Sequence, residues 1–103
     1  MAKYRLMVFT EPVEGREAEF NDWYNNQHLA DVVAVPGFSA GQRFKLVQLC
    51  DGEFKQRYLA IYEIDSPAVV ASKEWQTAGE WGDWAPKIRP HTTERYRSFF
   101  KKI

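Results

Sequence analysis

The alternation of side chains near the start of the chain predicts a β-strand. In residues 3–10, Leu6 and Val8 alternate with Met7 and Phe9. A two-residue period is typical of a strand whose side chains point to opposite faces of a sheet. Both faces of this strand carry apolar side chains, so both are expected to be covered.

The period then changes to three or four residues over residues 16–33, which predicts an amphipathic helix. The positions on its apolar face are Phe20, Trp23, Tyr24, Gln27/His28 and Asp31/Val32. The helix is expected to end before the sequence VPGF, because the residue before a proline avoids the α conformation and a glycine supplies the turn.

The rest of the chain predicts two strands, a second helix, a loop and a last strand. These are residues 38–49, 55–64, 65–79, 80–92 and 93–102, in that order. Asp51 and Gly52 form a typical hairpin turn between the two strands. Asp65 or Ser66 is expected to cap the second helix, and Gly79 to end it.

The resulting order, β-α-β-β-α-β, predicts an α+β, ferredoxin-like domain over residues 1–103. Its four strands form an antiparallel sheet with both helices on one face. The other face of such a sheet is usually polar, but the first and third predicted strands are apolar on both sides. We therefore expect a homodimer that buries this second face against another copy.

Charge and composition exclude several partners and compartments. The chain has 14 basic and 14 acidic residues, so no net charge draws it to nucleic acid or to an anionic membrane. No apolar run approaches the ~18 residues of a membrane span, and residues 1–9 do not resemble a signal peptide. The single cysteine, Cys50, excludes an internal disulfide. A cytoplasmic protein is expected.

The aromatic content of 16% suggests a pocket for a small hydrophobic or aromatic ligand, a partner surface, or both. On the first helix, Tyr24 lies one turn before His28, so both side chains can reach one cavity. A histidine there suits general acid or base catalysis. Asp31, three residues further on, could fix the tautomer of the imidazole. The alternative is a histidine that only interacts with the helix end.

Other residues are candidates for binding the ligand. Trp75, Trp81 and Trp84 could stack on a flat ligand, or they could be ordinary core or dimer contacts. Arg43 faces away from its neighbour Phe44 and could bind a carboxylate through its planar fork, or form a salt bridge at a surface or an interface. His91, in the predicted loop, could reach the pocket or remain on the surface.

A metal site is not expected. Such a site needs three or four converging ligands, and the chain offers two distant histidines, one cysteine and no carboxylate cluster with ligand spacing. Cys50 also lacks a neighbour that would activate its thiol as a nucleophile.

The sequence FNDWYNNQHLADVVAVPGF, followed by RF, resembles the EthD-like branch of the dimeric α/β-barrel superfamily, as do the element order and the length. The resemblance implies two ferredoxin-like units joined sheet to sheet, each with a small-molecule cleft between its sheet and its helices. Phe20, Tyr24 and His28 would then look into that cleft, with His28 as the family's helix histidine. Trp23 would neighbour them.

Proteins similar to this chain include aromatic-ring cyclases, muconolactone isomerases, cofactor-free monooxygenases and haem-degrading enzymes, so the fold alone does not fix the reaction. The second predicted helix offers Trp75 but no histidine to bind haem, and no cofactor is expected. The residues favour a cofactor-free isomerase, cyclase or lyase acting on an aromatic, lactone or polyketide-like compound. The alternatives are a non-catalytic accessory or ligand-binding protein and a cofactor-free monooxygenase.

Overall fold

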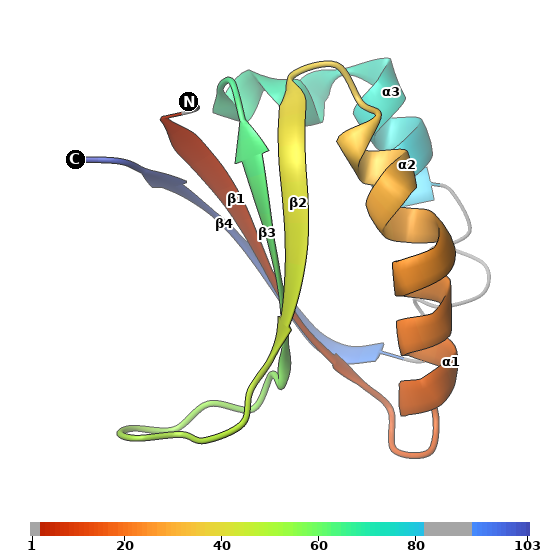
Figure 1. The fold of residues 1–103 in the computed structure, drawn as a ribbon, viewed down its shortest axis with the longest axis vertical. Helices are drawn as coiled ribbons and strands as arrows, with labels where there is room; N and C mark the ends of the chain where they lie inside the picture. The colour runs from red at the N-terminus through yellow and green to blue at the C-terminus, as the bar shows by residue number, and fades with distance from the viewer. Residues whose placement is uncertain (1–2, 82–91) are drawn as a thin grey trace.

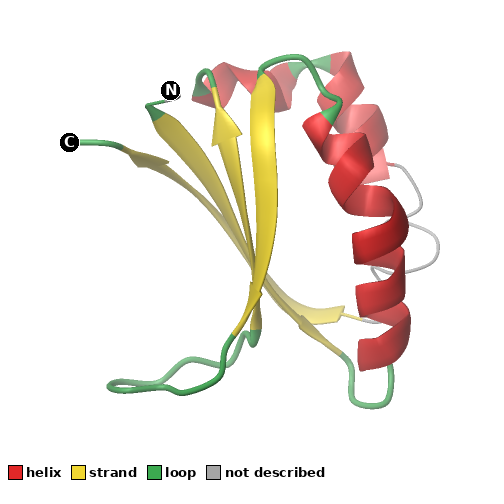
Figure 2. Cartoon of the chain, viewed as in Figure 1, coloured by secondary structure: helices red, strands yellow, loops and turns green. Residues whose placement is uncertain are grey.

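A computed structural model describes residues 3–81 and 92–103 of the chain. Four antiparallel strands form one sheet in the order β2-β3-β1-β4, and the helical segments lie along one of its faces (Figures 1 and 2). The elements are β1 Tyr4–Pro12, α1 Glu17–Trp23, η1 Tyr24–His28, α2 Leu29–Val33, β2 Phe38–Lys45, β3 Tyr58–Ile64, η2 Pro67–Ala71, α3 Lys73–Trp75, η3 Gln76–Trp81 and β4 Thr92–Lys101. This arrangement confirms the predicted α+β, ferredoxin-like fold.

Strand β1 lies in the centre of the sheet and pairs with both β3 and β4. Leu6 is opposite Tyr62 on one side and Phe99 on the other. Along β1, Leu6, Val8 and Thr10 are buried beneath the helices, whereas Met7 and Phe9 face the opposite side and are half-buried. The alternation predicted from the sequence is thus present, and it separates a helix-covered face from an open outer face.

The first helical run is continuous from Glu17 to Val33, but it is not a uniform α-helix. Its middle turn, Tyr24–His28, is a π-helix between α1 and α2. Nothing in the apolar spacing predicted this wider turn. The run ends at the predicted turn, where Gly37 has φ +97° and an added Cβ would lie 2.3 Å from Val69 Cγ1. Only glycine suits that position.

The second helical run begins as the sequence predicts and ends later. The Ser66 hydroxyl accepts a hydrogen bond from the Ala68 N–H at the start of the 3₁₀ segment η2. Ser72 then caps α3 by accepting from the Trp75 N–H. The predicted end at Gly79 is wrong, because the backbone continues as a π-helix to Trp81.

The hairpin between β2 and β3 is longer than predicted. The strands stop at Lys45 and resume at Tyr58, and residues 46–57 leave the sheet as a long loop (Figure 1). One further bond, from the Leu46 N–H to the Arg57 carbonyl at 2.7 Å, closes its base. Gly52 has φ +78°, as the predicted turn requires.

Candidate functional site

A small cavity lies between the helix-covered face of the sheet and the two helical runs. Its volume is about 20 Å³, enough for roughly one water molecule. The described residues that line it are Val8, Thr10, Tyr24, His28, Val32, Tyr62, Trp75, Arg95 and Arg97. Two of the residues singled out for catalysis, Tyr24 and His28, therefore meet at one cavity.

The π turn of the first helix sets the orientation of His28. Trp23 and His28 are stacked, with ring centroids 4.3 Å apart and 18° between the ring planes. In an α-helix, residues five apart point about 140° away from each other. A π turn, with hydrogen bonds between residues five apart, brings them to the same side. Such turns occur frequently at functional sites.

Tyr24 and Tyr62 join their hydroxyl groups at the cavity. The two oxygens are 2.5 Å apart, and either hydroxyl can be the donor. Tyr24 also meets the edge of the His28 ring, with centroids 4.8 Å apart and planes at 87°. Tyr62 was not among the residues selected from the sequence. It is separated from Tyr24 by 38 positions, and only the pairing of β3 beneath the helix brings them together.

Burial keeps the three ring groups uncharged near neutral pH. Desolvation lowers the pKa of His28 to about 4, and the positive charges of Arg43 and Arg95 lower it further. Desolvation raises the pKa of Tyr24 to about 12, against the opposing hydrogen bond from Tyr62. It raises the pKa of Tyr62 too, and the neighbouring Tyr24 adds to the rise. The site thus presents a neutral imidazole and two neutral phenols.

Arg43, on β2, faces away from Phe44 as predicted, and it lies against the ring of Tyr24 on the helix-covered face of the sheet. Its guanidinium carbon is 4.3 Å from the centroid of the Tyr24 ring. The guanidinium donates to Asn25 Oδ1 at 2.7 Å and to Asn21 Oδ1 at 2.8 Å. Burial lowers the pKa of Arg43. The guanidinium thus contacts two amide side chains and an aromatic ring, an arrangement that orients the cation over Tyr24.

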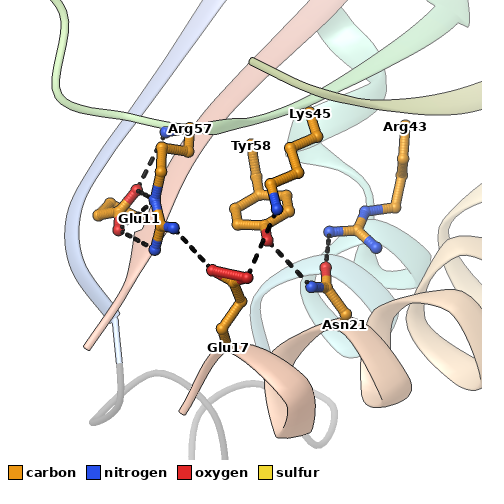
Figure 3. A network of polar contacts seen from close by, with 7 residues as sticks. All are labelled: Glu11, Glu17, Asn21, Arg43, Lys45, Arg57 and Tyr58. Atoms are coloured by element: carbon orange, nitrogen blue, oxygen red, sulfur yellow. Dashed lines mark hydrogen bonds and ion pairs between the residues drawn. The ribbon is translucent and has the colours of Figure 1, made fainter. Parts of the chain in front are cut away.

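A polar network extends from Arg43 toward the hairpin loop (Figure 3). The Asn21 side chain also donates to the Tyr58 hydroxyl at 3.2 Å. Arg57 binds both carboxylate oxygens of Glu11, at 2.6 to 3.0 Å, and forms an ion pair of 2.7 Å with Glu17. Lys45 approaches Glu17 at 3.6 Å. These contacts join the start of the first helix to the ends of β1, β2 and β3.

Other sequence candidates lie at or near the cavity. Phe20 is buried and meets the edge of Tyr24, with ring centroids 5.6 Å apart. Trp75 lines the cavity and stacks on Phe38, with centroids 5.5 Å apart and planes at 7°. Arg95 and Arg97 were missed, since the sequence of the last strand suggested only a solvated face.

Some of the ligand-binding residues expected from the sequence lie away from the cavity, and others lie outside the described part of the structure. Asp31 is exposed and lines a separate groove with Lys73 and Glu74, between α2 and α3. Trp81 is the last residue of η3, but its side chain lies outside the described part of the structure, as do Trp84 and His91. Their suggested contacts with a ligand stay predictions.

The described residues contain neither a metal-binding cluster nor a membrane-spanning helix. Within residues 3–81 and 92–103, no three His, Cys, Asp or Glu side chains gather as a metal site would require. None of the helices in that part of the chain is long and apolar enough to cross a membrane.

Comparison with known proteins supports the fold. No protein-family model matches the chain. A curated relative, core atranone cluster (CAC) protein 1 of Stachybotrys chlorohalonatus, is 35% identical over 75 residues, which are 71% of this chain. The match spans only 31% of that relative's length, so the relative's whole activity does not transfer directly.

Solved structures match over the whole fold. An EthD family protein from Bacillus halodurans has a TM-score of 0.71 and 19% identity, with 100% of both chains covered. SnoaB, a cofactor-independent oxygenase from Streptomyces nogalater, was solved as a mutant and has a TM-score of 0.66 and 19% identity, with 97% of this chain and 93% of its own covered. The comparisons thus confirm the fold expected from the sequence, a ferredoxin-like fold that this chain shares with the EthD family protein and with SnoaB.

Proposed function

We propose that this chain is a cofactor-independent enzyme that moves a proton on a small carbonyl compound, as an isomerase, cyclase or lyase. The observation that carries the proposal is the meeting of His28, Tyr24 and Tyr62 at one cavity, with all three pKa values shifted by burial. Strongly perturbed groups that converge in a cleft are typical of catalytic sites. The substrate would be aromatic, lactone or polyketide-like, because aromatic rings surround the site.

The roles follow from the protons that each group holds. Neutral His28 has one unprotonated ring nitrogen, which can take a proton from the carbon beside a substrate carbonyl. Within the Tyr24–Tyr62 pair, one hydroxyl donates to the other, and the second hydroxyl's proton remains available to the carbonyl oxygen. That hydrogen bond would stabilise the enolate oxygen as it forms. The imidazolium of His28 then returns its proton to another carbon or to a leaving group.

Names of similar proteins agree with small-molecule chemistry. SnoaB is described as a cofactor-independent oxygenase, and the curated relative is assigned to an atranone cluster. From these proteins we carry over to this chain only the general class, that of a protein which acts on small molecules without a bound cofactor. An oxygenase reaction is a variant in which an electron-rich ligand at the same cavity supplies its own electrons.

A non-catalytic ligand-binding or accessory protein is the second candidate, and the volume of the cavity favours it. A space of about 20 Å³ admits one water molecule, so a substrate enters only when lining side chains move. Arg95 and Arg97 on β4 have long side chains that can make this movement. Arg95 is half-buried and Arg97 is exposed.

We also propose that the chain functions as a homodimer joined through the outer face of its sheet. That face carries Phe44, Tyr96 and Phe100 with about half of each side chain exposed (47%, 56% and 52%). Exposed apolar surface of this kind is typical of a binding surface. The cytoplasmic location expected from the sequence stays a prediction.

Hydrogen–deuterium exchange in heavy water tests the catalytic proposal without knowledge of the true substrate. The protein is incubated with a panel of aromatic ketones and lactones, and loss of the proton beside the carbonyl is followed by NMR. We expect wild-type protein to accelerate exchange for at least one compound. His28→Gln should reduce the acceleration by about 100-fold or more, and Tyr24→Phe by about 10-fold or more.

Asn26→Ala, on the exposed side of the same π turn, is the matched control and should exchange as wild type does. Binding of a compound beside His28 without any acceleration of exchange would favour the accessory protein. An acceleration that persists in His28→Gln would exclude His28 as the base.

A further inference from the structure

Two arginines of β4 reach the cavity beside the proposed catalytic groups. In the pairing of β1 with β4, Arg95 is opposite Thr10 and Arg97 is opposite Val8. Because the two arginines are two residues apart on one strand, both project from the helix-covered face. Both line the cavity together with His28 and the two tyrosines. The Arg97 guanidinium lies 5.7 Å from the ring centroid of Trp75.

The charge of the described lining is positive. Near neutral pH, His28 is neutral and both tyrosines are protonated. Arg95 and Arg97 then carry the formal charges of that lining, which includes no carboxylate among the described residues. A third guanidinium, that of Arg43, lies over the face of the Tyr24 ring and adds to the positive potential at His28.

Such a lining would favour an anionic ligand over an uncharged one. A guanidinium fork binds a carboxylate or a phenolate through charge-assisted hydrogen bonds, which are about twice as strong as neutral ones. Aromatic walls at Trp75 and His28 would hold a planar ring next to that group. An uncharged ligand of the same shape would contact the aromatic walls but would not form the charge-assisted hydrogen bonds.

We propose that the ligand is an aromatic organic anion whose carboxylate or phenolate oxygen is bound by Arg95 and Arg97. This inference rests on the proposed function, since it names the class of compound that enters the cavity beside His28. A bound anion also favours the protonated form of a nearby imidazole. The ligand would thus make His28 a stronger base when it binds.

Matched pairs of probes test the charge preference. Benzoate and 2-naphthoate are compared with benzamide and 2-naphthamide, which have nearly the same shape and no charge. Binding is measured by titration, and its place is read from the NMR signal of the His28 ring. We expect each acid anion to bind at least about 10-fold more tightly than its amide, and its binding to weaken at high salt.

The variants separate the arginines from general electrostatics. Arg95→Gln and Arg97→Gln should each remove most of the preference, and Arg95→Lys should retain part of it. Arg16→Gln is the control, because Arg16 is exposed at the start of the first helical run. Its guanidinium pairs with Glu19 at 2.9 Å. It should bind all probes as wild type does. Thermal unfolding followed by circular dichroism verifies that each variant is folded.

The outcomes distinguish this inference from the proposed function. Equal binding of anions and amides, with the His28 signal perturbed by both, overturns the anion preference and leaves the ligand site in place. A preference that survives both glutamine variants overturns the assignment to Arg95 and Arg97. Failure of all four probes to bind or to shift the His28 signal counts against both the anion preference and the ligand site.

Discussion

Trp23 lies flat against His28, with ring centroids 4.3 Å apart and 18° between the planes. The stack exists because the π turn of Tyr24–His28 places residues five apart on one side of the helix. His28 also has an edge contact with Tyr24 and lines the cavity. The wider turn thus buries the imidazole in contact with two aromatic rings.

The first prediction concerns the titration of His28. Its pKa of about 4 lies below the usual 6.5, so the folded state loses stability as the pH falls from about 6.5 toward 4, where the unfolded chain takes up the proton. A shift of this size corresponds to roughly 3 kcal/mol of unfolding free energy. An NMR titration of the ring signal, assigned with His28→Gln, should show no protonation between pH 5 and 8.

The Trp23→Leu variant tests the cause of this shift. Removing the indole admits water to the imidazole, so the pKa of His28 should rise toward its ordinary value. A wild-type His28 that titrates near pH 6.5 would show that the imidazole is solvated and that the stack does not persist in solution.

The second prediction concerns the hydrogen bond between Tyr24 and Tyr62. Tyr24→Phe and Tyr62→Phe should each destabilise the fold by about 1 kcal/mol, since each leaves one hydroxyl in a cavity large enough for a replacing water. The double variant should cost less than the sum, with a coupling of about 1 kcal/mol. Urea unfolding measures all three. Tyr4→Phe is the control, and strictly additive losses would rule out a direct bond.

The fold could be predicted from the sequence because its signals are local. Alternation in residues 3–10 and the turn at Pro36–Gly37 act over a few positions. Both residues proposed for catalysis, Tyr24 and His28, were also accessible in this way, since they lie on one helix. Tyr62, Arg95 and Arg97 reach the site only through strand pairing. The π turn was missed because a pattern of three- and four-residue spacings does not distinguish it from an α-helix.

The third prediction concerns Gly41, which makes room for Tyr62. A Cβ added at Gly41 would lie 2.9 Å from both Tyr62 Cδ1 and Val33 Cγ2. Gly41→Ala should therefore destabilise the fold by about 1–3 kcal/mol through overpacking, although alanine otherwise suits a strand better than glycine. Ser39→Ala, on an exposed part of β2, should stay within about 0.5 kcal/mol of wild type. Unfolding in urea compares the two, and equal stabilities would mean that Tyr62 and Val33 yield easily.

The fourth prediction concerns Arg57, which joins Glu11 to Glu17 (Figure 3). Its hydrogen bonds to Glu11 raise the pKa of Arg57, so it stays charged at every accessible pH. Arg57→Gln should cost about 1 kcal/mol at low salt and less in 1 M NaCl, because the pairs are partly exposed and screened. Arg16→Gln, which breaks a simpler exposed pair, should cost less. Equal losses, or a loss that does not change with salt, would exclude a cooperative network.

The fifth prediction concerns the outer face of the sheet. Ile61 lies on that face, opposite Met7 in the neighbouring strand and half-buried in the single chain. If two copies join there, Ile61→Lys places an unpaired charge in the interface and should weaken dimerisation by about 100-fold or more. Sedimentation velocity at micromolar concentration measures the assembly. Ala30→Lys adds the same charge to the exposed helical surface and should leave the dimer intact.

The variants also locate the interface. A wild-type chain that sediments as a folded monomer at micromolar concentration would refute the dimer outright. Weakening by Ala30→Lys alone would move the interface to the helical side, because Ala30 and Ile61 lie on opposite sides of the molecule. Loss of assembly in Ile61→Lys alone would instead mean that Phe44, Tyr96 and Phe100, exposed in one chain, are covered by the partner while the cavity beside His28 remains within each subunit.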